Sequence, residues 1–131
     1  MARALQNSKS MYSQLINQIE NAFHEGFSDN SFRKLGKGYV GPLEIKDEED
    51  FYLIKKIIVG FDSDDITANV RKSILKVFVK NEKEKPTDAV SLRIDTDYID
   101  ATKISSKLKN GILEIKLPKS ENSKTVKISV E

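Results

Sequence analysis

The residues of this sequence that are able to carry out chemistry are few and scattered. His24 is the only histidine, and the absence of cysteine excludes a thiolate nucleophile, a disulfide and a cysteine-based zinc site. The acidic clusters at residues 47–50 and 62–65 offer the oxygen ligands that calcium prefers, but neither has the spacing of an EF-hand loop. We interpret both clusters as solvated turns and expect no catalytic residue, no metal ligand and no cofactor.

Residues 36–41, with the sequence G-K-G-Y-V-G, match the glycine pattern of dinucleotide-binding loops. That interpretation needs a strand before the pattern, a helix after it and a βαβ unit around both. Arg33 and Lys34 precede the pattern and Pro42 follows it, so a linker is favoured over a nucleotide site. No H-E-x-x-H, P-loop or G-x-S-x-G motif is present, and we expect a protein that is not an enzyme.

Composition indicates one domain with a heavily charged surface. The 131 residues suffice for a domain with short extensions, and 38% are hydrophobic while 32% are charged. A net charge of +2 gives no argument for nucleic acid, and no apolar run approaches the roughly 20 residues of a membrane helix. No signal peptide is recognisable at the N-terminus, and the lack of cysteine fits a reducing compartment such as the cytoplasm.

Residues from about 9 to 24 show the periodicity of an amphipathic helix. The apolar stripe consists of Met11, Leu15, Ile16, Ile19 and Phe23, and Gly26 lies just beyond it as a C-terminal stop. The stripe either packs on the core of its own domain or meets other subunits and misfolded clients. A polar, glycine-bearing stretch over residues 27–41 separates this helix from the rest, which favours the second interpretation.

From Pro42 onward the pattern changes to the period of two that is typical of β-strands. We expect strands at residues 43–46, 51–59, 66–71, 75–80 and 89–95, separated by turns and charged loops. The segment 51–59 is apolar on both faces apart from Lys55 and Lys56, which indicates a central or covered strand. Many short strands with turn signals between them predict an all-β sandwich.

The stretch from residue 103 to 119 predicts a β-hairpin. Asn110-Gly111 is the preferred two-residue turn, because both central positions of that turn need positive φ. The flanking residues alternate between apolar and polar, and Pro118 ends the second strand because it cannot donate to a ladder.

This hairpin resembles a signature of the small heat-shock protein family. Residues 106–113 resemble the A-x-x-x-n-G-x-L motif of the α-crystallin domain, with Ser106 in place of the usual alanine, and residues 117–119 resemble the L-P-K that follows. The resemblance spans roughly residues 43–131. It implies an immunoglobulin-like antiparallel β-sandwich over residues 42–119, preceded by a helical arm and Gly-rich linker at 1–41 and followed by a flexible C-terminal extension at 120–131.

The resemblance also implies how subunits join through the C-terminus. Ile128-Ser129-Val130 resembles the family's I-x-I/V motif, with which the tail of one subunit adds to the sheet edge of a neighbour. By the family's pattern the receiving groove lies between residues 66–71 and 103–108, with Val70, Ile104 and Leu108 as candidate walls. The register of the motif stays open, because Val126 and Ile128 have the same spacing as Ile128 and Val130. The alternative that the tail is a final strand paired within its own sheet also stays open.

For the dimer we expect pairing along the edge strand that carries Val90, Leu92 and Ile94. Family members that exchange a strand use a long loop at this point, and residues 81–88 are too short for one.

The resemblance implies an ATP-independent holdase chaperone of the stress response. It would form a homo-oligomer built from dimers and bind partly unfolded client proteins, without cofactor, nucleic acid or membrane span. The helix stripe would bind clients and take part in contacts between subunits. Two alternatives remain: a CS-domain-like co-chaperone or adaptor, and a non-enzymatic β-sandwich that serves as a structural or binding module.

Overall fold

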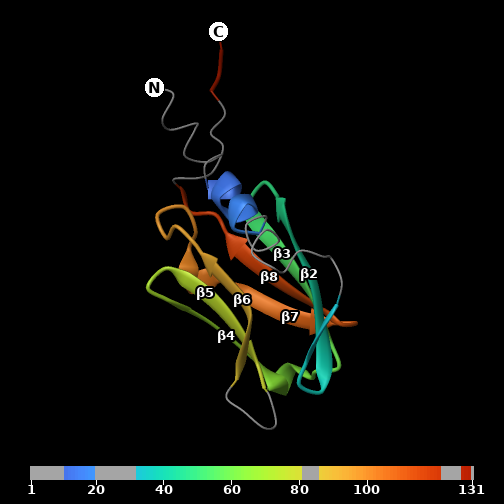
Figure 1. Cartoon of the computed structure of the whole chain (residues 1–131). Coiled ribbons are helices and arrows are strands. Elements are labelled where there is room, and N and C mark those ends of the chain that lie inside the picture. The colour runs from blue at the N-terminus through green and yellow to red at the C-terminus, as the bar shows by residue number, and fades with distance from the viewer. Residues whose placement is uncertain (1–10, 20–31, 81–85, 122–127, 131) are drawn as a thin grey trace.

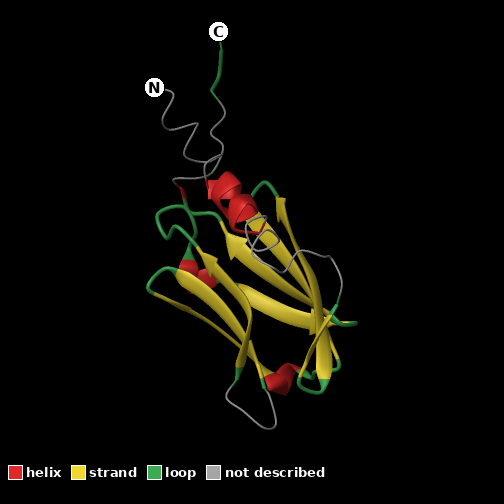
Figure 2. Ribbon diagram, viewed as in Figure 1, coloured by secondary structure: helices red, strands yellow, loops and turns green. Residues whose placement is uncertain are grey.

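The computed structural model describes residues 11–19, 32–80, 86–121 and 128–130. Residues 11–19 form a helix, and eight strands and two short 3-10 helices follow in this part of the chain (Figures 1 and 2). The elements are β1 (Arg33–Leu35), β2 (Gly38–Asp47), β3 (Phe51–Val59), η1 (Ser63–Asp65), β4 (Ile66–Arg71), β5 (Ile74–Val79), β6 (Thr87–Arg93), η2 (Ala101–Lys103), β7 (Ser105–Lys109) and β8 (Ile112–Pro118).

The strands form two antiparallel sheets, which confirms the predicted β-sandwich. One sheet has the order β1-β2-β3-β8-β7 and the other the order β4-β5-β6. The inward side chains of both sheets supply the core, including Ile54, Ile115, Leu75, Val77 and Leu92. The two sheets therefore bury one face each, as the period of two predicts.

The β7–β8 hairpin has the turn that its sequence predicts. Asn110 and Gly111 adopt φ values of 52° and 77°, and the strands pair from Lys109↔Ile112 to Ser105↔Lys116. Leu113 and Leu117 point inward and are buried. The hairpin places β7 at the free edge of the larger sheet.

The predicted linker over residues 27–41 is wrong where the structure describes it. β1 and β2 form a hairpin around a turn in which Gly36 has a φ of 61°, and β2 continues along β3. A Cβ atom on Gly38 would lie 2.1 Å from the carbonyl oxygen of Val59, so a close backbone approach requires glycine there. A strand, not a helix, follows the glycine pattern; residues 27–31 lie outside the described part.

The helix at residues 11–19 packs against its own domain. Met11 and Leu15 are 1% and 0% exposed and belong to the core, and the ring of Tyr12 stacks on Tyr52 at 6.5 Å between centroids. This is the first of the two interpretations of the apolar stripe. Ile16 and Ile19 are partly buried against the same core, and Phe23 lies outside the described residues.

Lys56 occupies an unusual position, because it lies on the core-facing side of β3. It alternates with the buried Ile54 and Ile58, and its cross-strand neighbours are Leu43 and Leu113. Burial lowers the pKa of Lys56 to about 8, with a smaller contribution from the positive charge of Arg33. A charged lysine at this position therefore opposes folding at neutral pH.

Replacing Lys56 by methionine should stabilise the domain by about 1–3 kcal/mol at pH 7, the lower values reflecting the exposed part of the side chain. The pKa in the unfolded chain is about 10.4, so between pH 8 and pH 10 the unfolded state binds more protons. The wild-type free energy of unfolding should thus rise with pH across this window, and that rise should vanish in Lys56→Met. Urea denaturation at several pH values measures both effects.

Lys55→Met is the matched control, since Lys55 lies on the opposite face between Glu44 and Glu114. Lys55→Met should neither raise the free energy of unfolding at pH 7 nor remove its rise between pH 8 and pH 10. Identical pH slopes in wild type and Lys56→Met would contradict the expectation.

Candidate functional site

A groove opens between the two sheets where both end in a free strand edge. β4 and β7 are the edge strands on this side, each paired on one side only among the described strands. The groove has a volume of about 370 Å³, with Leu75 and Ile115 among its lining residues. Exposed edges carry unpaired N–H and C=O groups, and such edges accept a further strand.

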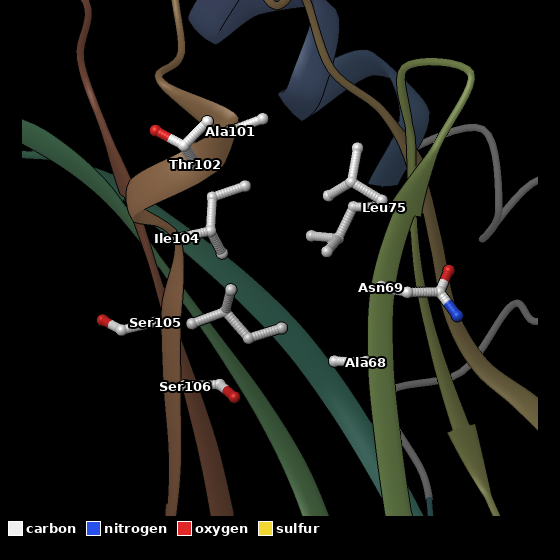
Figure 3. Close-up of a pocket in the computed structure, with 10 residues that line it drawn as sticks. Ala68, Asn69, Leu75, Ala101, Thr102, Ile104, Ser105 and Ser106 are labelled. Atoms are coloured by element: carbon white, nitrogen blue, oxygen red, sulfur yellow. The ribbon is translucent and has the colours of Figure 1, made fainter.

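Residues of β4, of the start of β7 and of the segment just before β7 line the groove (Figure 3). Ala68 and Ile104 face the space between the strands, whereas Asn69 and Ser105 point away from it. Ala68 is small and exposed, so the groove stays open at that point. An extended segment whose alternate residues are aliphatic has the shape to fill this groove.

The helix η2 fixes one end of the groove. Asp100 accepts hydrogen bonds from the Thr102 amide at 3.1 Å and from its hydroxyl at 2.6 Å, and the Asp100 amide donates to the carbonyl of Pro118 at 2.9 Å. The hydroxyl of Thr102 holds the pKa of Asp100 below its usual range. Ile104 follows η2 directly, so these bonds set the position of that wall.

Two of the three predicted wall residues line the groove. Val70 and Ile104 are among its lining residues, whereas Leu108 is not. Leu108 pairs with Leu113 further along β7 and packs against the core. Leu75 and Ile115 were missed as lining residues because an alternating strand pattern shows which side chains face inward but not which lie beneath an edge.

The tail residues lie outside this groove in the structure. Ile128 and Val130 are 83% and 91% exposed, and residues 128–130 belong to no strand. Upstream, the chain is anchored where it leaves β8: the Ser120 amide donates to Tyr98 O at 3.0 Å and its hydroxyl donates to Asp97 O at 2.7 Å. The role of Ile128 and Val130 in assembly stays a prediction.

The predicted dimer strand is β6, which lies at the free edge of the smaller sheet. Val90, Leu92 and Ile94 point into the core and are buried, so only its backbone and the alternate residues face outward. At Arg93, the side-chain amide of Gln18 bonds the outward backbone groups of the strand. It accepts from Arg93 N at 2.7 Å and donates to Arg93 O at 2.9 Å.

The acidic clusters have structural partners. In residues 62–65 a capping box closes η1, and Lys37 Nζ lies 2.7 Å from Asp65 Oδ2, which holds the pKa of Asp65 below its usual range. Lys119 Nζ lies 2.6 Å from Asp47 Oδ1. Within the described part of the chain, no three histidine, cysteine or acidic residues are grouped to hold a metal ion, and His24 lies outside that part. No helix among the described residues is long and apolar enough to cross a membrane.

Together these features define a class of protein: an antiparallel β-sandwich with a groove between two free strand edges. The description of the family whose model matches residues 44–131 is Hsp20/alpha crystallin family. The chain therefore belongs to this family.

Solved structures of small heat-shock proteins share the fold. A small heat-shock protein from Xylella fastidiosa has 24% identity and a TM-score of 0.50, over 68% of this chain and 94% of that chain. HSP18.5 from E. histolytica has 22% identity and a TM-score of 0.51, over 68% and 96%. Heat shock protein 16.0 from Schizosaccharomyces pombe has 21% identity and a TM-score of 0.50, over 68% and 73%. No curated protein sequence matches the chain.

Proposed function

We propose that this protein is an ATP-independent holdase chaperone that acts as an oligomer in the cytoplasm. It binds partly unfolded proteins and prevents their aggregation. Membership of the Hsp20/alpha crystallin family supports the chaperone role. The observation that carries the proposed assembly is the groove between β4 and β7, together with two exposed aliphatic side chains, Ile128 and Val130.

In the proposed assembly, the tail of one subunit adds a strand to the groove of another. Burial of one aliphatic side chain contributes about 1.5–3 kcal/mol, and ordering the tail opposes this gain. One tail contact is therefore weak and reversible. Many such contacts in a closed assembly reinforce one another through high effective concentration, so the assembly is stable while its subunits exchange.

The chaperone activity is tested by heating a client protein with and without the purified full chain while light scattering is recorded. Scattering should fall as the ratio of chaperone to client rises, with no nucleotide present. Added ATP should leave the curve unchanged, and an equal mass of an inert protein should give no protection. A requirement for ATP would reject the holdase mechanism, and a lack of protection would favour the co-chaperone or structural alternatives.

The dimer is proposed to form along β6, and Ser91→Pro should split it. In an antiparallel strand, the backbone N–H groups of successive residues point alternately to the two sides of the strand. Arg93 N–H points outward to Gln18, so Ser91 N–H, two residues earlier, points outward as well. Proline at Ser91 thus removes a donor that only a partner strand would use. Mass measurement by light scattering should show loss of the dimeric unit, whereas Ser91→Ala should retain it.

Leu92 is unsuitable for this test, because by the same alternation its N–H faces β5. Proline there is expected to disrupt the sandwich itself. A Ser91→Pro protein that keeps its dimers would show that β6 is not the dimer edge.

A further inference from the structure

The outer face of the larger sheet carries an exposed apolar patch, remote from the groove. Phe32, Tyr39, Val59 and Ile112 are 52%, 46%, 42% and 37% exposed, respectively. Tyr39 pairs with Val59 and Ile57 pairs with Ile112 across the strands, so these side chains share one face. We call these five residues, Phe32, Tyr39, Ile57, Val59 and Ile112, the outer patch.

The patch is contiguous. A Cβ atom on Gly41 would meet the Phe32 ring at 3.0 Å and Ile57 at 3.1 Å, and one on Gly111 would meet Val59 at 3.3 Å. Phe32 therefore lies over Gly41 beside Ile57, and Val59 lies beside the β7–β8 turn. Contiguous exposed apolar surface of this kind marks an interaction site.

Lysines surround the patch and extend over the whole face. By strand alternation and pairing, the same face carries Lys34 of β1, Lys46 of β2, Lys55 of β3, Lys116 of β8, and Lys107 and Lys109 of β7. The acidic strand residues on this face are Glu44, which pairs with Lys55, and Glu114, which lies 3.8 Å from Lys107. The described strands thus give this face an excess of four positive charges, twice the net charge of +2 of the whole chain.

This charge pattern selects the kind of partner. A second copy packed through the same face would bring the two sets of lysines together, which is unfavourable. The lysines lie on all five strands, a width of about 20 Å at the usual strand spacing. The partner must therefore be flat and anionic over that width, and apolar where it meets the patch.

We propose that the outer face of the larger sheet is a peripheral docking surface for a membrane that contains anionic lipids. The lysines contact the headgroups, and the outer patch inserts between them to the level of the upper acyl chains. Each lysine near such a surface adds to binding, and the attraction is screened by salt. The surface is distinct from the groove and does not depend on the holdase activity.

The test is co-sedimentation of the full chain with vesicles. Vesicles of phosphatidylcholine with about a third phosphatidylserine should sediment the protein, and vesicles of phosphatidylcholine alone should not. Binding should fall at least tenfold when salt is raised from 0.1 M to about 0.5 M. Equal binding to both vesicles, or no binding to either, would overturn the proposal.

Two pairs of variants with the same change in net charge locate the surface. Lys34→Glu with Lys109→Glu alters the outer face, while Arg71→Glu with Lys72→Glu alters the β4–β5 turn of the other sheet. The first pair should reduce the partition onto anionic vesicles at least tenfold, and the second should leave it within twofold, with both proteins folded by circular dichroism. Equal losses would overturn the assignment to this face. Binding of polyglutamate but not of vesicles would assign the face to acidic polypeptides instead.

Discussion

Replacing Ile128 and Val130 by alanine should reduce the proposed large assembly to dimers or small oligomers, with little change in thermal unfolding. Both side chains are exposed in the structure and contribute nothing to the core, so truncating them should leave the domain intact and remove only the contacts that the proposed assembly would make through them. Each tail contact that is lost lowers the binding free energy only modestly, but the loss is repeated at every tail contact of a closed assembly. Size-exclusion chromatography with light scattering measures the mass.

The groove offers a reciprocal experiment with an intact tail. Ala68→Lys places a long side chain in the groove, whereas Thr67→Lys places the same side chain on the opposite face of β4. Ala68→Lys should reproduce the loss of mass and Thr67→Lys should not. Val126→Ala, combined with intact Ile128 and Val130, tests the alternative register.

Two outcomes would contradict this view of the tail. Full-sized assemblies from the doubly substituted protein would show that the tail is not the link between subunits. A loss of several kcal/mol in domain stability would show that residues 128–130 form an internal strand in solution.

Leu15→Ala should destabilise the domain by about 2–5 kcal/mol, the range observed when a buried leucine is truncated. Leu15 is fully buried, and its neighbour on the helix face, Met11, is also part of the core. Urea denaturation monitored by circular dichroism should show a lower midpoint. The matched control is Asn17→Ala, because Asn17 is exposed on the same helix and its replacement should leave the midpoint almost unchanged.

The same variant separates the two interpretations of the helix. If Leu15→Ala leaves the midpoint unchanged but weakens protection of a client, the helix is undocked in solution and its stripe is available to clients. If the midpoint falls as expected, Leu15 is a core residue, and client binding through this stripe would require the helix to leave the sandwich first.

Local patterns were sufficient to predict most of the sheet. The turn at Asn110-Gly111, the apolar run of β3 and the alternation along β4 and β8 depend on neighbouring residues, so the sequence predicts them well. The glycines at 36–41 misled the prediction, because their role depends on contacts far along the chain, such as that of Gly38 with Val59. Composition alone does not distinguish a glycine that loosens a chain from one that admits a close neighbour.

The site was predicted in part, for a similar reason. The family resemblance named Val70 and Ile104 as groove walls, and both line the groove. Leu108 has the same alternation as Ile104 but is not among the residues that line the groove, and no local signal distinguishes the two. The docking of Met11 and Leu15 likewise depends on which surface the helix meets, which an amphipathic pattern leaves undefined.

Hydrogen bonds of Ser120 to the carbonyl oxygens of Tyr98 and Asp97 fix the point at which the chain leaves the sandwich. Eight residues lead from Ser120 to Ile128, and a fully extended chain advances by about 3.3–3.6 Å per residue, so Ile128 reaches at most about 29 Å from that anchor. Any groove that a tail occupies must lie within this radius of the donor's Ser120. The anchor therefore limits the spacing and symmetry of subunits in a tail-linked particle, and lengthening the tail should widen the range of particle sizes.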